Sequence, residues 1–276
     1  MTQEFSLKRV FQRGFNLVKY NQVLIIPLLV FFLITGMFLQ PVTLAAGNLF
    51  FTLVAILGIT AVFLAGWLNM FKNCLKQSKN DNLPSSEKTI KSLNLFRSFF
   101  PGVGKYFNKI ILGIILYFFA FNLFMLILEI IILPLVGQFE SFSPHNIQQT
   151  FNTPEQAISF FENLPQGDRE KILTIGFIEL IFSIVFFYLT MFWSQFIIIE
   201  NTNPLFALRD SIKTTVKDPA NTLSIFFFSA AGTFITVLLG VLFGSNPIVQ
   251  LIVLILLVYV IAYYLTMTFI YLEHRK

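Results

Sequence analysis

The sequence predicts an all-α membrane protein, a polytopic bundle of six transmembrane helices in three hairpins, each hairpin preceded by an amphipathic cytoplasmic helix. Three observations lead to this class. The 276 residues are 56 % hydrophobic and only 12 % charged, far more apolar than a typical soluble domain. Apolar runs long enough to cross a hydrocarbon core of about 30 Å recur along the chain. Short charged segments separate these runs, as in a membrane protein with several spans.

The six predicted spans form a single integral membrane domain, residues 1–276. Their ranges are 22–39, 49–71, 110–136, 172–199, 223–243 and 248–272, with an outer loop at 138–171 and cytoplasmic loops at 72–109 and 200–221. A cleavable signal peptide is the rival interpretation of the first run, but that run is long for one and no clear cleavage site follows it. Trp67, near the inner end of the second run, is expected at the membrane interface.

The distribution of basic residues predicts the orientation. All but Arg169 and Lys171 of the 19 Lys and Arg residues fall in alternate loops or near the two ends of the chain. By the positive-inside rule, this places the N- and C-termini on the cytoplasmic side of a bacterial cell membrane. The net charge of +5 is then a consequence of topology, and no nucleic-acid partner is expected.

The N-terminal stretch, residues 3–20, is predicted to be a basic amphipathic helix. Apolar residues recur at helical spacing, and lysine and arginine occupy the other faces. Such a helix can lie on an anionic inner leaflet, and the alternative is a flank of the first span whose long basic side chains snorkel. The apolar stripe consists of Leu7, Phe11, Phe15 and Val18.

Two more amphipathic helices are expected in the cytoplasmic loops. The first should end at Pro101-Gly102, and the second should begin at Asn203-Pro204, which pairs an N-cap residue with proline at the first helical position. Their apolar stripes are Ile90, Leu93, Phe96 and Phe100, and Leu205, Leu208, Ile212 and Val216. The basic residues expected to contact anionic lipid headgroups are Lys8, Arg9, Arg13, Lys19, Lys88, Lys91, Arg97, Arg209 and Lys213.

Capping signals predict helices in the outer segment. Thr153-Pro154 supplies an N-cap followed by proline, and the helical pattern continues to Pro165. Asp168 is then expected to cap the helix that leads into the fourth span.

Glu129 and Glu179 are the ionisable residues inside the long apolar runs, and intramembrane carboxylates are candidate functional groups. Each lies about 30 Å of helix from the nearest cytoplasmic charge, so both can reach the same outer level. In one interpretation they simply reach headgroup water. In the other they face each other and bind a proton or a cation.

Small and polar residues inside the spans predict helix packing. Gly232, Thr236, Gly240 and Gly244 recur every four residues, which lets another helix approach closely, either the sixth span or a second copy of the chain. The polar residues within the third and fourth spans are explained by interhelical hydrogen bonds or, alternatively, by a substrate path. They are Asn122, Ser183, Ser194 and Gln195.

No catalytic motif stands out. Cys74, His145 and His274 each stand alone, without partners at metal-ligand spacing, so no metal or other cofactor is expected. A phosphate-binding loop, a nucleophile elbow and an HExxH motif are lacking, which disfavours an enzyme.

The run from Ile197 to Phe228 resembles the YciC-like family of bacterial six-span membrane proteins. It contains the end of an apolar span, the turn Glu200-Asn201, the helix PLFALRDSIKTTVKD and the start of another span. That family is similar to the membrane domain fused to some glycerophosphodiester phosphodiesterases. The resemblance implies an inner-membrane protein without established active-site residues, and the phosphodiesterase activity is not expected.

The preferred functional hypothesis is therefore a non-enzymatic accessory or scaffold protein. Its basic inner face would hold anionic lipid and a membrane or cytoplasmic protein partner. The alternative is a small permease, or a membrane component of a transporter, that uses Glu129 and Glu179.

Overall fold

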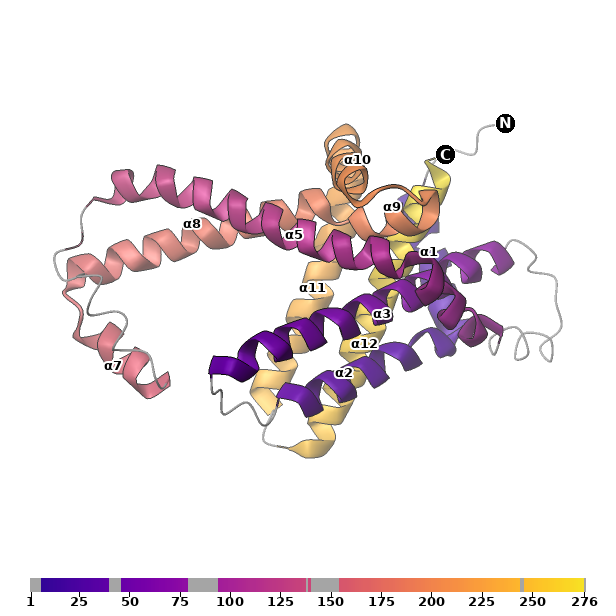
Figure 1. Ribbon diagram of the computed structural model, residues 1–276, viewed down its shortest axis with the longest axis horizontal. Coiled ribbons are helices and arrows are strands. Elements are labelled where there is room, and N and C mark those ends of the chain that lie inside the picture. Colours follow the sequence, from indigo (N-terminus) through magenta and orange to yellow (C-terminus); the bar gives the residue numbers. More distant parts are fainter. Residues whose placement is uncertain are drawn as a thin grey trace. The chain divides into compact units, whose positions relative to one another are not determined.

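The computed structural model describes residues 6–39, 46–78, 94–137, 139, 154–243 and 246–275. Regular structure within these ranges is entirely helical, which confirms the all-α class. The elements shown in Figure 1 are α1 (Leu7–Tyr20), η1 (Gln22–Leu24), α2 (Ile26–Leu39), α3 (Ala46–Ser78), α5 (Phe99–Val136), α7 (Pro154–Asn163), α8 (Gln166–Thr190), α9 (Trp193–Glu200), α10 (Pro204–Lys217), α11 (Pro219–Phe243) and α12 (Pro247–His274).

Five helical segments of the described chain are long and apolar enough to cross a membrane. They are residues 52–78, 94–136, 166–200, 219–243 and 247–274. In the most apolar windows of the second and third segments, only 11 % and 6 % of the residues are buried. An apolar surface of that extent is suited to lipid, because a protein that exposed it to water would aggregate.

A sharp bend separates the N-terminal helix from the first predicted span. The chain bends by 87° between Leu7–Tyr20 and Gln22–Gly36, and counting this bent pair as one span gives six in all. Helix α2 alone has 14 residues, about 21 Å, which is short of a hydrocarbon core of about 30 Å. The break has a local cause, because the Asn21 side-chain amide donates to the Leu17 carbonyl at 2.9 Å and so caps α1.

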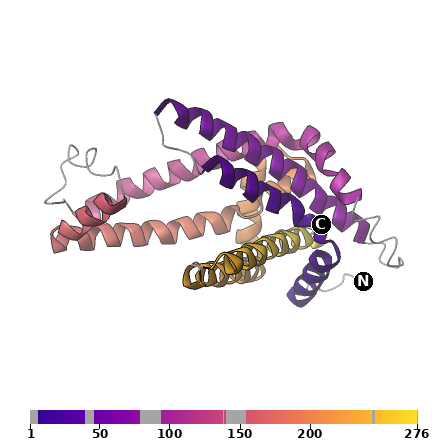
Figure 2. The ribbon, with the colours of Figure 1, turned by 90° about the horizontal axis from the view of Figure 1, so that it is seen from below.

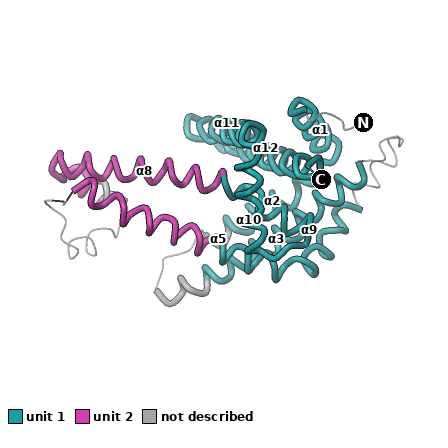
Figure 3. The backbone as a smooth tube through the Cα atoms, turned by 90° about the horizontal axis from the view of Figure 1, so that it is seen from above, with its two compact units in different colours: residues 1–116, 189–276 teal, residues 117–188 magenta. Residues whose placement is uncertain are grey.

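The chain divides into two compact units (Figure 3). Unit 1 comprises residues 1–116 and 189–276, and unit 2 comprises residues 117–188. In unit 1, α11 lies beside α12 and α2 lies beside α3 (Figures 1 and 2).

Helix α1 packs across α12, and its buried face is not the predicted apolar stripe. Of that stripe only Val18 is buried, whereas Phe15 is 59 % exposed. The buried face instead centres on Val10, Gly14 and Leu17. A Cβ atom at Gly14 would lie 3.2 Å from the side chain of Met267 on α12, so the small residue allows this close crossing.

The core of unit 1 is rich in stacked aromatic rings. Trp67 is 2 % exposed, and its ring lies 4.8 Å from that of Phe63 and 5.2 Å from that of Phe71. The Trp67 indole N–H donates to the Leu24 carbonyl, with 2.6 Å between the heavy atoms. The indole therefore binds a carbonyl of the short 3-10 turn at the bend, and the level of Trp67 in the membrane stays a prediction.

The start of α5 crosses α3 closely, and Pro101-Gly102 lies within helix α5 rather than ending a helix as predicted. Proline is tolerated there because the first turn needs no backbone N–H partner within the helix. A Cβ at Gly102 would lie 2.5 Å from Asn69 Cβ and 2.8 Å from the Ala65 carbonyl oxygen. Glycine at this position is what permits the crossing.

Unit 2 contains the second half of α5, together with α7 and most of α8. Aromatic rings fill the space between α5 and α8: Phe121 lies 5.3 Å from Phe186 and 5.5 Å from Phe187. The predicted helix after Thr153 is present as α7 and begins at Pro154. Asp168 lies inside the first turn of α8, where it forms an ion pair of 3.7 Å with Lys171, and so it does not cap that helix as an N-cap residue.

Candidate functional site

The fourth predicted span is interrupted, and the interruption is hydrogen bonded to α10. Residues 191–192 form a turn between α8 and α9. The Phe192 N–H donates to Ser211 Oγ at 3.0 Å, and Ser211 Oγ donates to the Leu189 carbonyl at 3.0 Å. Thr215 Oγ1, one turn further along α10, donates to the same carbonyl at 3.4 Å. Neighbouring Ser and Thr hydroxyls thus bind backbone groups that the break removes from the helix.

Two lysines bind the carboxyl end of α9. Lys72 Nζ, from α3, donates to the Ile198 and Ile199 carbonyls and, at 3.0 Å, to the Tyr106 hydroxyl. Lys109 Nζ, from α5, donates to the side-chain oxygen of Asn201 at 2.9 Å. Cations at this end of a helix complement its unpaired carbonyls and its dipole. Asn201 ends α9 in the left-handed conformation, with φ of 57°.

Helix α9 is also joined to α12 by buried polar and aromatic contacts. A hydrogen bond of 3.1 Å links the side-chain amide of Gln195 to the hydroxyl of Thr268, and both side chains are buried. The rings of Phe192 and Tyr271 stack at 5.3 Å. The Tyr271 hydroxyl then donates to a carboxylate oxygen of Asp218 at 2.8 Å, at the junction of α10 and α11. Helices α9, α10 and α12 therefore form one connected cluster.

A basic pocket of about 230 Å³ lies within this cluster. Arg275 Nη1 donates to the Thr214 carbonyl at 3.1 Å, which places its guanidinium at the end of α10. Lys213 and Lys217 are exposed, and neither makes a hydrogen bond or an ion pair with the part of the chain that the structure describes. The pocket is lined by Phe196, Glu200, Asp210, Lys213, Thr214, Lys217, Leu272 and Arg275.

The charges of this pocket favour an anionic group. Three basic side chains line it against two carboxylates, and Arg209 forms an ion pair of 3.2 Å with one of these, Asp210. Guanidinium and ammonium groups are the usual partners of phosphate oxygens in proteins. The described residues hold no cluster of three His, Cys, Asp or Glu side chains suited to a metal ion.

The outer face of α10 is apolar, although the helix lies next to this pocket. Leu205, Ile212 and Val216 are 62 %, 41 % and 64 % exposed. Its inward face is made of small and polar residues that include Ala207 and Ser211. Of the predicted apolar stripe, only Leu208 is buried, so most of that stripe faces outward. The predicted cap is present: Asn203 Oδ1 accepts from the Leu205 N–H at 3.3 Å.

The structure does not pair Glu129 with Glu179. Glu129 is exposed and Glu179 is partly exposed, and among the described residues neither carboxylate makes a hydrogen bond or an ion pair. Of the polar residues near them, Asn122 donates to its own helix, at the Phe118 carbonyl. Ser183 Oγ lies 3.8 Å from the sulfur of Met125. No polar path links the two carboxylates within the described part of unit 2.

The small residues of α11 lie against α12. A Cβ at Gly232 would lie 3.2 Å from Val260, and one at Gly240 would lie 3.2 Å from Val253. Thr236 is buried between them and donates to the Gly232 carbonyl at 2.8 Å. Gly244 lies outside the described residues. This face therefore serves packing within the chain.

The other predicted lipid-contacting basic residues lie in several places. Lys8, Arg9, Lys19 and Arg97 are exposed, and Lys88 and Lys91 lie outside the described residues, as does His145. Arg13 instead forms an ion pair of 3.4 Å with Glu273 and donates to Ser78 Oγ at 3.2 Å. Arg13 therefore joins α1 to α12 and α3.

Sequence reasoning missed the residues that hold α9 in place, chiefly Lys72, Lys109, Ser211 and Arg275. The sequence predicts a loop over 72–109 because charged residues usually end a span, whereas the structure places Lys72 in α3 and Lys109 in α5. A signal for Ser211 was present, since Ala207, Ser211, Thr214 and Thr215 lie on one helical face opposite Leu205. That small polar face indicates close packing against another helix.

The apolar helices and the arrangement of polar contacts define a multi-pass helical membrane protein. Comparisons of the chain with models of known protein families, with curated proteins and with solved structures find no match.

Proposed function

We propose that this chain is a non-enzymatic accessory or scaffold protein of the bacterial cytoplasmic membrane that binds anionic phospholipid at a basic inner face. Both termini lie in the cytoplasm in this proposal, because almost all lysine and arginine residues belong to the same set of alternate segments. A kinship with the YciC-like proteins, which rests on the turn Glu200-Asn201 and the helix that follows it, is part of the same proposal.

The observation that carries the proposal is the division of α10 into two faces. The inward face binds the broken span through Ser211, while the outward face exposes Leu205, Ile212 and Val216. Arg209 and Lys213 are exposed on the same helix. An apolar face bordered by basic residues is typical of a helix that lies at the surface of an anionic bilayer.

The basic pocket supplies the headgroup contact in this proposal. Lys213, Lys217 and Arg275 come from α10 and the end of α12 and leave a space of about 230 Å³. The phosphate of a bound lipid would neutralise the excess positive charge there. The acyl chains of the same lipid would lie along the apolar helices. Each basic residue near an anionic leaflet contributes about 1 kcal/mol to such binding.

The lipid retained by the purified full chain tests this proposal. The protein is extracted in detergent, incubated with equal amounts of phosphatidylglycerol and phosphatidylcholine, and the bound ratio is measured by mass spectrometry. We expect phosphatidylglycerol to dominate. The double variant Lys213→Gln/Lys217→Gln should lower its share about fivefold or more, since each lysine contributes about 1 kcal/mol.

The matched control is Lys76→Gln/Lys105→Gln, which removes the same charge from exposed positions outside the pocket. This control should leave the bound ratio close to that of the unaltered chain. An equal loss in both double variants, or no preference for phosphatidylglycerol at all, would contradict a specific headgroup site.

A further inference from the structure

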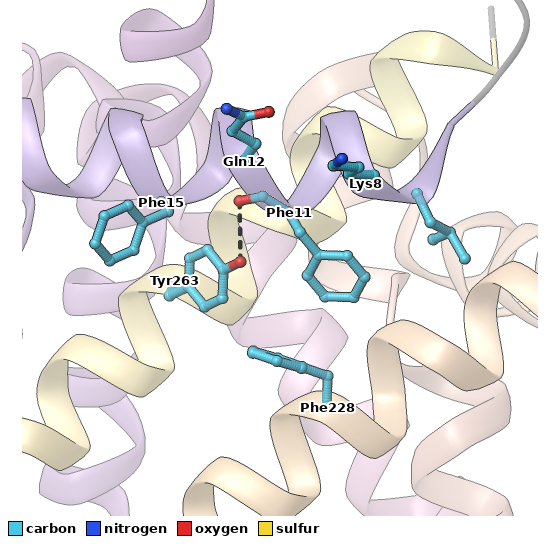
Figure 4. Close-up of a pocket in the computed structure, with 7 residues that line it drawn as sticks. Lys8, Phe11, Gln12, Phe15, Phe228 and Tyr263 are labelled. Carbon is cyan, nitrogen blue, oxygen red and sulfur yellow. Dashed lines mark hydrogen bonds between the residues drawn. The ribbon is translucent and has the colours of Figure 1, made fainter.

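We propose that a groove between α1, α11 and α12 holds one acyl chain of an anionic phospholipid, with the lipid phosphate beside Lys8 (Figure 4). This surface is separate from the basic pocket and shares no residue with it. The groove has a volume of about 730 Å³ and is widely open along one side.

Aromatic rings from three helices line the groove. Phe11 of α1 lies 4.9 Å from Phe228 of α11, and Phe228 lies 5.7 Å from Tyr263 of α12. Phe15, one turn along α1, lies 6.4 Å from the Tyr263 ring. Figure 4 shows these four rings around a common space. Such a surface favours a long apolar group over a polar one.

The polar atom of Tyr263 does not make the groove polar. Its hydroxyl donates to the Phe11 carbonyl at 2.9 Å, so the bond ties α12 to α1 and leaves the ring as an apolar surface. Lys8 and Gln12 supply the polar groups of the lining. A bound peptide would need hydrogen-bond partners for its backbone N–H and C=O groups along its whole length. This lining offers polar side chains only at Lys8 and Gln12.

The ammonium group of Lys8 favours an occupant that carries a negative charge at one end. Its side chain is exposed, and it forms no ion pair or hydrogen bond with the residues that the structure describes. An apolar groove with one ammonium group beside it matches an amphiphile with an anionic head. The groove also lies at a depth that an acyl chain reaches, since Phe228 lies nine residues, about 14 Å of helix, beyond Pro219 at the start of a membrane-spanning segment.

Photolabelling of the full chain in nanodiscs tests this inference. The discs contain phosphatidylcholine and a minor share of phosphatidylglycerol with a photoreactive diazirine on one acyl chain, and labelled positions are found by peptide mass spectrometry. We expect Phe11, Phe15 and Phe228 to be labelled several-fold more than Phe118 and Phe177, which are also exposed and lie in helices long and apolar enough to cross a membrane. Equal labelling at both sets of positions means annular lipid only, and overturns the inference.

Charge variants supply the matched control. Lys8→Gln should lower groove labelling about fivefold, as expected for one lysine near an anionic headgroup. Lys76→Gln removes the same charge from an exposed residue of α3 that does not line the groove, and it should leave labelling unchanged. Equal losses in the two variants, or full labelling in Lys8→Gln, overturn the inference.

A second pair of variants tests the aromatic lining. Phe228→Ala should lower groove labelling, whereas Phe227→Ala, on the same helix and outside the lining, should not. If Phe228→Ala does not fold, the comparison of Lys8→Gln with Lys76→Gln tests the inference by itself. The double variant Lys213→Gln/Lys217→Gln should leave groove labelling intact, so the groove and the basic pocket can fail independently.

Discussion

The hydroxyl of Ser211 accepts a 3.0 Å hydrogen bond from the Phe192 N–H, and it donates at 3.0 Å to the Leu189 carbonyl on the other side of the same break. One small side chain of α10 therefore binds both ends of an interruption in a membrane-spanning segment. In an apolar environment an unpaired backbone group is costly, so this contact ties the position of α10 to the conformation of the span.

Ser211→Ala should destabilise the protein by about 1–3 kcal/mol, because the Phe192 N–H loses its hydroxyl partner and the Leu189 carbonyl keeps only the 3.4 Å bond from Thr215. The measurement is the midpoint of thermal unfolding of the full chain in detergent. Ser224→Ala is the control, because the Ser224 hydroxyl is exposed and donates to its own helix at the Ala220 carbonyl. If Ser224→Ala shifts the unfolding midpoint as much as Ser211→Ala does, the Ser211 hydroxyl does not stabilise the break between α8 and α9.

Lys72→Met should also lower stability, by about 1–3 kcal/mol, since the carbonyls at the end of α9 would lose a charged donor. Chemical denaturation followed by tryptophan fluorescence is a suitable readout, because Trp67 and Trp193 are the two tryptophans of the chain. Lys76→Met removes an exposed lysine of the same helix and is expected to stay within about 0.5 kcal/mol. If the two variants behave alike, Lys72 does not stabilise α9.

Gly102→Ala should destabilise the crossing of α3 and α5 by about 1–3 kcal/mol, because the new methyl group would overlap Asn69 and the Ala65 carbonyl. Gly104→Ala, two residues further along the same helix, meets nothing within 4 Å. It should stabilise the helix by about 0.5–1 kcal/mol through its better helix propensity. Opposite shifts of the unfolding midpoint are therefore expected, and shifts of the same sign would refute the close crossing.

Glu129→Gln and Glu179→Gln distinguish the proposed function from the transporter alternative. A lipid-binding accessory protein should retain its unfolding midpoint and its bound lipid ratio in both variants, because neither carboxylate has a polar partner among the described residues. Proton flux into liposomes that contain the protein is the second measurement. Flux in the unaltered protein that disappears in either variant would favour the permease.

Cysteine labelling in intact cells tests the proposed orientation. On a Cys74→Ser background, a membrane-impermeant maleimide should label Gln149→Cys in the predicted outer loop and should not label Ser86→Cys in the predicted cytoplasmic loop. Permeabilised cells provide the control, since both positions should then react. The reverse pattern in intact cells would overturn the orientation and the lipid-facing roles that depend on it.

Several elements were readable from local sequence because their causes are local. Asn203-Pro204 begins α10 where the cap predicts it, and Pro154 begins α7. The apolar runs predicted six spans, and five helical segments of the described chain are long and apolar enough to cross a membrane, since the composition of a run determines whether it can face lipid. These signals involve residues within one or two helical turns of each other.

The tertiary structure alone decided which side of each helix is buried. In a membrane protein, lipid is as apolar as the protein interior, so an apolar stripe does not identify the buried face. Leu205, Ile212 and Val216 face outward, while Ser211 faces inward, because a hydroxyl is needed at the break between α8 and α9. The contacts of Lys72 and Lys109 with the end of α9 likewise join residues that are distant in the chain. The sequence by itself determined an all-helical chain with several lipid-compatible runs, and long-range hydrogen bonding determined where those runs break and what they bind.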